Sequence, residues 1–202
     1  MTKLQLFKRV RSVKYIHLEP ETASYFAERE NGTLRLLFEE SNGKTDWKNN
    51  FRFFAIPRKP YKDMTAAWFA HRGFLGVWKT IEPRLAETIA DPTVTRIEIA
   101  GYSHGGAIAL LCYEYCKFNR PDIEVTGVGF GAPRVVWGPV PREVKKRMAD
   151  FLVIRNGGDI VTHVPPRIFG FRHIGKVEVV GKPVGPFADH FPSAYRNALA
   201  DK

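Results

Sequence analysis

Hydrophobic and polar residues alternate near the start of the chain and follow helical spacing further along. Residues 25–29 and 33–39 alternate around Asn31-Gly32, a dipeptide that adopts tight left-handed turns, so they predict a β-hairpin. Apolar residues from Phe74 to Ile89 recur every three or four positions, which predicts a helix. Shorter runs predict strands at 51–56, 94–100, 125–130, 151–155 and 176–180, and helices at 107–118 and 193–200.

The order of these predicted elements indicates an α/β fold. From residue 74 onward helices and strands alternate, and such chains make right-handed crossovers within a mostly parallel sheet. The hairpin then belongs at one edge of a mixed sheet. Residues 57–62, rich in Pro and Lys, predict a turn region. Because no linker is long enough to divide the chain, we expect residues 1–202 to form a single domain.

The first eleven residues are basic and amphipathic. A helix packed on the domain is the favoured interpretation, and a membrane-touching helix or an organellar targeting segment are the alternatives. We see no apolar run of signal-peptide length and no stretch of about 18 apolar residues that could span a bilayer. Cys112 and Cys116, four apart in a predicted helix, fit buried small hydrophobes rather than a disulfide scaffold. Together these features favour a cytoplasmic location.

Basic residues outnumber acidic ones by 31 to 21, giving a formal net charge of +10. Such a surface attracts nucleic acid, anionic lipid or acidic substrates. The basic residues are spread along the chain, without the clustered stripe and stacking aromatics of a nucleic-acid-binding module, so an obligatory nucleic-acid partner is not expected. The spacing of His163, His173 and His190 does not fit a zinc site. We therefore expect no metal and no cofactor.

The sharpest chemical signal is Gly101-Tyr102-Ser103-His104-Gly105-Gly106, which fits G-x-S-x-G. It lies between a predicted strand and a predicted helix, the setting of a nucleophile elbow. A Cβ atom at position 101 or 105 would collide with neighbouring backbone, and the serine takes strained backbone angles. Ser103 would then stand at a helix N-terminus, where the dipole favours a nearby oxyanion. We predict Ser103 as the nucleophile.

A serine nucleophile needs a base to accept its proton. In this fold the acid and then the histidine follow the serine along the chain. His190 lies in a loop after the last predicted strand, where it could reach Ser103, and is the favoured base. His173 is the runner-up, His163 falls just past the favoured acid, and His104 is expected to point away from the site.

Asp159 is the favoured acid because it follows the predicted strand at 151–155, where a carboxylate can orient the imidazole. Asp150 and Asp189 are the alternatives. Asp150 precedes that strand and so lies at the wrong end of the sheet, while Asp189 adjoins His190, and sequence neighbours rarely face each other well.

Several segments, in order, resemble the class 3 lipase family of the fungal triacylglycerol lipase type over roughly residues 33–198. The most specific is Phe-Gly-Ala-Pro-Arg-Val at 130–135, which matches the family pattern outright. The other matching segments are Phe38 to Ser41 with Asp46-Trp47, His71 to Phe74, Gly101 to Gly106, Asp159 to Val161 with Val164 to Pro166, and His190 with Tyr195.

The resemblance implies an α/β-hydrolase fold, with helices on both faces of a mostly parallel sheet. It also implies that Ser103, Asp159 and His190 form a catalytic triad, and that Ser41 and the backbone N–H of His104 form an oxyanion hole. The expected activity is hydrolysis of carboxylic esters through an acyl-enzyme. The expected partner is a lipid, such as an acylglycerol, or a small ester.

Two departures from the family pattern qualify this expectation. Glu39-Glu40 stands where the family has Arg-Gly, and carboxylates near an oxyanion are unfavourable. The region of the family's lid, residues 42–50, is short and polar apart from Trp47, which favours short acyl chains. The first alternative function is a lipase-like protein with weakened catalysis that binds anionic membrane surfaces, and the less favoured alternative is a basic nucleic-acid-binding module. Among the minor motifs, we expect a structural role for His71 and expect Arg134 to hold a turn.

Overall fold

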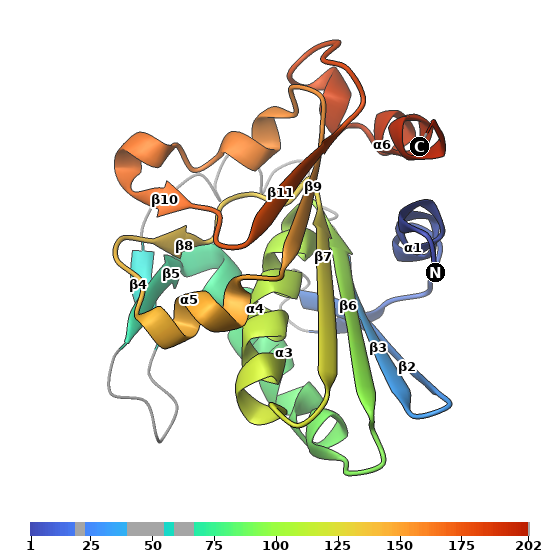
Figure 1. Ribbon diagram of the computed structural model, residues 1–202, viewed down its shortest axis with the longest axis vertical. Coiled ribbons are helices and arrows are strands. Elements are labelled where there is room, and N and C mark those ends of the chain that lie inside the picture. The colour runs from blue at the N-terminus through green and yellow to red at the C-terminus, as the bar shows by residue number, and fades with distance from the viewer. Residues whose placement is uncertain (19–22, 40–54, 59–66, 202) are drawn as a thin grey trace.

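The computed structural model describes residues 1–18, 23–39, 55–58 and 67–201. Its centre is a seven-stranded sheet with helices on both faces (Figure 1). The strands across this sheet are β1 (Ile16–Leu18), β2 (Ala23–Glu30), β3 (Thr33–Phe38), β6 (Arg96–Tyr102), β7 (Glu124–Phe130), β9 (Leu152–Asn156) and β11 (Lys176–Val180). The helices are α1 (Lys3–Val10), α3 (Arg72–Ala90), α4 (His104–Asn119), α5 (Arg142–Met148) and α6 (Pro192–Ala200).

The sheet is antiparallel at one edge and parallel elsewhere. Strands β1, β2 and β3 pair antiparallel, and Asn31 and Gly32 turn the hairpin with φ of +48° and +76°. From β3 onward every neighbouring pair is parallel. The predicted hairpin, its place at one edge and the mostly parallel sheet are therefore confirmed. The parallel arrangement brings the carboxyl ends of β6, β7 and β9 to one side of the molecule.

Two helical layers cover the sheet. Helices α3, α4 and α5 pack over one face, while α1 and α6 lie side by side over the other (Figure 1). Phe7 and Val10 of α1 are buried against this second face, which confirms the interpretation of the N-terminal segment as a packed helix. Among the described residues, no helix is long and apolar enough to cross a membrane.

A second, smaller sheet was largely missed by the sequence pattern. Its strands, across the sheet, are β10 (Phe171–Arg172), β8 (Val136–Trp137), β5 (Trp68–His71) and β4 (Ala55–Arg58). The predicted turn region at 57–62 is wrong at Pro57 and Arg58, which pair with β5. Strand β4 is outermost in this sheet, where a proline's missing N–H is tolerated. Such short strands leave too few residues for a periodic pattern. Residues 51–54 and 59–62 lie outside the described ranges.

Candidate active site

Ser103 occupies a sharp turn between β6 and α4. Its φ of +55° and ψ of −122° are strained for a residue with a side chain. A Cβ atom on Gly101 would lie 2.1 Å from the carbonyl oxygen of Gly105, and one on Gly105 would lie 2.2 Å from that of Phe38. Both positions therefore require glycine, as expected from the motif. The turn places the Ser103 side chain at the carboxyl end of the sheet.

The structure brings Ser103, His190 and Asp159 together from three separate segments. His190 Nε2 lies 2.9 Å from Ser103 Oγ, and His190 Nδ1 lies 2.9 Å from Asp159 Oδ2. The Asp159 side chain is fully buried. A carboxylate beside Nδ1 favours the tautomer whose unprotonated Nε2 faces the serine. This imidazole can therefore accept the hydroxyl proton, and the buried carboxylate can stabilise the imidazolium that results.

Asp159 is fixed by two further hydrogen bonds. The hydroxyl of Tyr195, in α6, donates to Asp159 Oδ2 at 2.6 Å, and the backbone N–H of Val161 donates to Oδ1 at 2.9 Å. Burial, together with the adjoining carboxylate, raises the pKa of Tyr195 far above its usual value, so its hydroxyl stays a donor. The sequence placed Tyr195 only within a family motif. Its role at the acid follows from the packing of α6 alone.

The rival acid Asp189 instead holds the loop that carries His190. It is buried, and its Oδ2 accepts a hydrogen bond from Gly158 N at 2.7 Å while its Oδ1 accepts one from Val184 N at 3.1 Å. Its own carbonyl accepts a bond from the Asn156 side chain at 3.0 Å. A charged group satisfied by backbone donors stabilises a loop strongly. Asp189 is therefore a structural residue beside the site.

Tyr102, which precedes Ser103, contacts both the backbone and the ring of His190. Its hydroxyl donates to the backbone carbonyl of His190, and the two rings stack at 5.2 Å with 18° between their planes. In the sequence, Tyr102 is marked only as the residue before Ser103 in the G-x-S-x-G motif. Its contact with a residue 88 positions away had no local signal.

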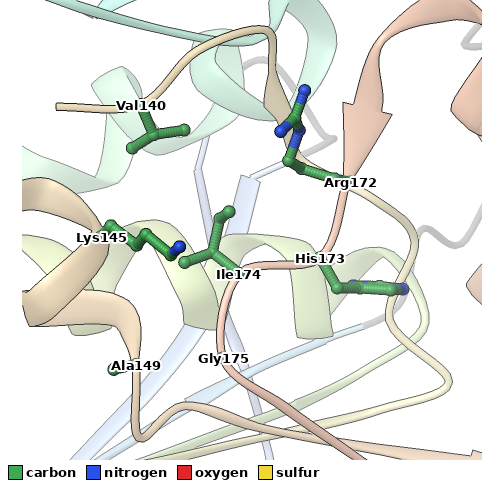
Figure 2. A pocket seen from close by; sticks show the side chains of 7 residues that line it. All are labelled: Val140, Lys145, Ala149, Arg172, His173, Ile174 and Gly175. Atoms are coloured by element: carbon green, nitrogen blue, oxygen red, sulfur yellow. The ribbon is translucent and has the colours of Figure 1, made fainter. Parts of the chain in front are cut away.

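The runner-up base, His173, lies elsewhere. It lines a separate cavity of about 470 Å³ with Lys145, Arg172 and Ile174, and its ring is directed away from Lys145 (Figure 2). His173 Nε2 contacts the carbonyl of Thr162 at 2.8 Å, and burial lowers the pKa of His173 to about 4. It therefore remains a neutral structural group.

The other discarded candidates also have partners of their own. Asp150 is exposed and pairs with Lys176 at 2.8 Å. His163 Nε2 lies 3.1 Å from Arg155 Nη1. The ring of His104 packs edge-on against Phe74, and burial lowers the pKa of His104 to about 4.

The structure describes the residue that carries one of the two expected oxyanion donors. His104 is the first residue of α4, and the first N–H groups of a helix have no partner within it. The backbone N–H of His104, directly after Ser103, therefore stays a predicted donor for an anionic oxygen. Ser41, Glu40 and residues 42–50 lie outside the described residues, so the second donor and the lid stay predictions.

Arg134 and His71, the residues of the two minor motifs, both make structural contacts, and the Arg134 side chain holds a segment other than its own turn. Arg134 Nη1 donates to the carbonyl oxygens of His163 and Pro165 at 2.5 and 3.1 Å, which fixes the loop after Asp159. His71 is buried, and its ring packs at 4.4 Å from that of Phe74. Cys112 and Cys116 are free, buried thiols. Over the described residues, no group of three His, Cys, Asp or Glu side chains is placed to hold a metal ion.

Comparison with known proteins identifies the family. Residues 36–169, more than half of the chain, match the family model of the class 3 lipases. The chain belongs to the class 3 lipase family. It is 26% identical over 152 residues to a lipase of Rhizomucor miehei, covering 71% of this chain and 40% of that protein. It is also 26% identical over 133 residues to the secreted mono- and diacylglycerol lipase 1 of Fusarium solani, covering 63% of this chain and 38% of that protein.

Solved structures of fungal lipases share its fold. The triacylglyceride lipase of Rhizomucor miehei superposes with a TM-score of 0.67 at 24% identity, covering 83% of this chain and 65% of that one. At this identity the likeness establishes the fold, an α/β-hydrolase with helices on both faces of its sheet. The chain spans about 40% of the length of the curated relatives it matches. Its own activity is therefore argued from the site.

Proposed function

We propose that this protein is a serine carboxylic ester hydrolase that acts on acylglycerols or other lipid-like esters. The deciding observation is the single imidazole of His190, which lies 2.9 Å from both the Ser103 hydroxyl and the Asp159 carboxylate. A triacylglycerol lipase of the same fold has a serine protease triad as its catalytic centre. The arrangement here supports the same division of roles.

The reaction would begin with attack of Ser103 Oγ on the ester carbonyl, while His190 Nε2 takes the hydroxyl proton. The backbone N–H of His104 would stabilise the oxyanion. Collapse of this intermediate breaks the ester bond, and His190 returns the proton to the leaving alcohol. Water, activated by the same imidazole, then hydrolyses the acyl-enzyme and releases the acid. Throughout, Asp159 holds the imidazole in place and stabilises its charged form.

Exposed apolar side chains near the histidine favour a lipid-like ester over a soluble one. Phe187 and Phe191, which flank His190 in sequence, are 73% and 60% exposed. Large apolar side chains gathered on a surface mark contact with an apolar partner. Relatives named as acylglycerol lipases agree with this substrate class.

The second candidate function is binding to anionic membrane surfaces with weakened catalysis. Its support is Glu39, a carboxylate at the end of β3 where the family has arginine. The backbone carbonyl oxygen of Glu39 packs against the elbow, because it lies 2.5 Å from where a Cβ atom on Gly105 would be. This candidate predicts vesicle binding without turnover of any ester.

A fluorophosphonate probe, which forms a covalent bond with an activated serine, tests the proposed function. We expect the wild-type protein to be labelled and Ser103→Ala to be unlabelled. The matched control, Ser24→Ala on strand β2, should label like the wild type. Hydrolysis of p-nitrophenyl esters of rising chain length, below and above their solubility limit, would then define the acyl preference. Absence of labelling in the wild type, or equal labelling of Ser103→Ala, would reject the proposal.

A further inference from the structure

Helices α1 and α6 lie on the sheet face opposite α3, α4 and α5 (Figure 1). Residues of both helices line a groove. Its volume is about 530 Å³. The residues that line it are Phe7, Lys8, Arg11, Ser12, Pro192, Ser193 and Arg196. The triad does not use this groove, and α1 precedes the segment that matches the family model.

The groove has a strongly positive lining. Lys8, Arg11 and Arg196 are exposed, and none of the lining residues is acidic. Lys8 and Arg196 form no ion pair with any described residue. By contrast, Arg9 in the same helix is paired with Glu28. Three basic side chains on a concave surface, two of them without an acidic partner among the described residues, attract a multivalent anion or an anionic surface.

The guanidinium of Arg11 links the groove to the active site. It lies over the ring of Tyr102, 5.2 Å from the ring centroid. Tyr102 in turn stacks on His190. The positive groove is therefore separated from the catalytic imidazole by a single aromatic ring.

Exposed apolar residues lie on the loop of residues 181–191, the histidine loop, which leads directly into the groove at Pro192. Phe191 directly precedes Pro192 of the groove, and Phe187 precedes His190 by three residues. Val184, on the same loop, is 86% exposed. Apolar side chains beside basic ones are typical of surfaces that lie at a membrane interface, where the cations contact headgroups and the apolar groups enter the acyl boundary.

We propose that this groove docks the protein onto membranes that contain anionic phospholipids. Lys8, Arg11 and Arg196 contact headgroup phosphates, while Phe187 and Phe191 enter the lipid beside them. This proposal rests on the proposed function, because docking here would bring His190 to the membrane surface that holds a lipid ester. Charge complementarity selects an anionic membrane as the partner over a neutral lipid surface.

Vesicle co-sedimentation of the Ser103→Ala protein tests this docking without interference from hydrolysis. The probes are phosphatidylcholine vesicles, with and without phosphatidylglycerol. We expect stronger partitioning onto the anionic vesicles, reduced by added salt. In the double variant Lys8→Gln/Arg196→Gln, the partition coefficient onto the anionic vesicles should fall about thirty-fold, as expected for the loss of two basic residues close to an anionic surface. Phe187→Ala should weaken binding to both kinds of vesicle.

The matched control is Lys79→Gln/Arg84→Gln, which removes the same two charges from exposed positions of α3 on the other face. It should partition like its parent. Equal losses in the two double variants would show an effect of overall charge and overturn the groove as the docking site, as would no loss in Lys8→Gln/Arg196→Gln. Failure of fluorophosphonate labelling would reject the proposed function and leave the binding result standing, so the two failures are distinguishable.

Discussion

The nucleophile elbow and the histidine loop hold the two proposed catalytic side chains, Ser103 and His190, in different ways. The elbow is constrained by close backbone packing, since a Cβ atom on Gly101 would meet the carbonyl of Gly105, and one on Gly105 would meet the carbonyl of Phe38 in the adjoining strand β3. The histidine loop, residues 181–191, is held by side chains from distant segments, including Asn156 and Tyr102. One side chain is therefore positioned by close backbone packing and the other by long-range hydrogen bonds.

This difference indicates how each region should fail. The elbow cannot relax without moving β6, α4 and β3, so damage there should reduce stability and activity together. The loop can move away while the sheet remains folded, so damage there should affect activity more than the fold. The following substitutions test that contrast, beginning with the contact between Asp159 and His190, where the carboxyl end of β9 meets the loop.

Replacing the acid should have the largest effect. In Asp159→Asn the amide no longer favours the imidazole tautomer with a free Nε2, so we expect kcat to fall by about 10⁴-fold. The rate of p-nitrophenyl ester hydrolysis measures this. Asp150→Asn, at the exposed rival position, should leave the rate unchanged. Equal rates for wild type and Asp159→Asn would exclude Asp159 as the acid.

Filling the elbow comes next. In Gly105→Ala the new Cβ atom would lie 2.2 Å from the Phe38 carbonyl oxygen, so the backbone must shift, and we expect a loss of about 3–5 kcal/mol of unfolding free energy together with activity. Gly76→Ala is the control, because a Cβ atom there meets nothing within 4 Å. That variant should gain up to about 1 kcal/mol in helix α3. Urea denaturation measures both. Similar stability of the two variants would contradict the close packing of the elbow.

Releasing the loop should be milder for the fold than filling the elbow. Asp189→Ala removes the acceptor for the backbone N–H groups of Gly158 and Val184, with an expected cost of about 2–3 kcal/mol. Activity should fall more than tenfold even well below the unfolding transition, because His190 loses its fixed position. A stability loss with unchanged kcat would show that His190 keeps its position without the Asp189 carboxylate.

The smallest effect concerns pH and stability. Burial lowers the pKa of His173 from 6.5 to about 4, so between these values the unfolded chain binds more protons than the folded one, and stability falls as the pH decreases. From pH 7 to pH 5 this group should account for a loss of about 2 kcal/mol in unfolding free energy. In His173→Gln the loss of unfolding free energy between pH 7 and pH 5 should be smaller by this amount, as measured by urea denaturation at both pH values. An unchanged pH dependence would contradict the buried neutral state.

Much of the fold was predictable because its determinants are local. Asn31-Gly32 fits the two left-handed positions of the hairpin, and apolar spacing gave helix α3 to within a few residues. Lys176–Val180 appeared as a strand with the bounds the structure shows. The two-residue strands β8 and β10 escaped detection, since two residues have no period. Pro57 was misplaced because nothing local identifies an outermost strand.

By itself the sequence identified the elbow, because the G-x-S-x-G pattern is contained in five residues and Gly101 is needed for contacts within it, whereas Gly105 is needed because of Phe38 in β3. It also ranked Asp159 and His190 first among their rivals. Only the tertiary structure brought His190 to a serine 87 positions away and gave Tyr195 and Asp189 their separate tasks. It alone created the basic groove between the two ends of the chain. Burial and hydrogen bonding between distant segments depend on how the sheet is assembled, and no local pattern of residues encodes that assembly.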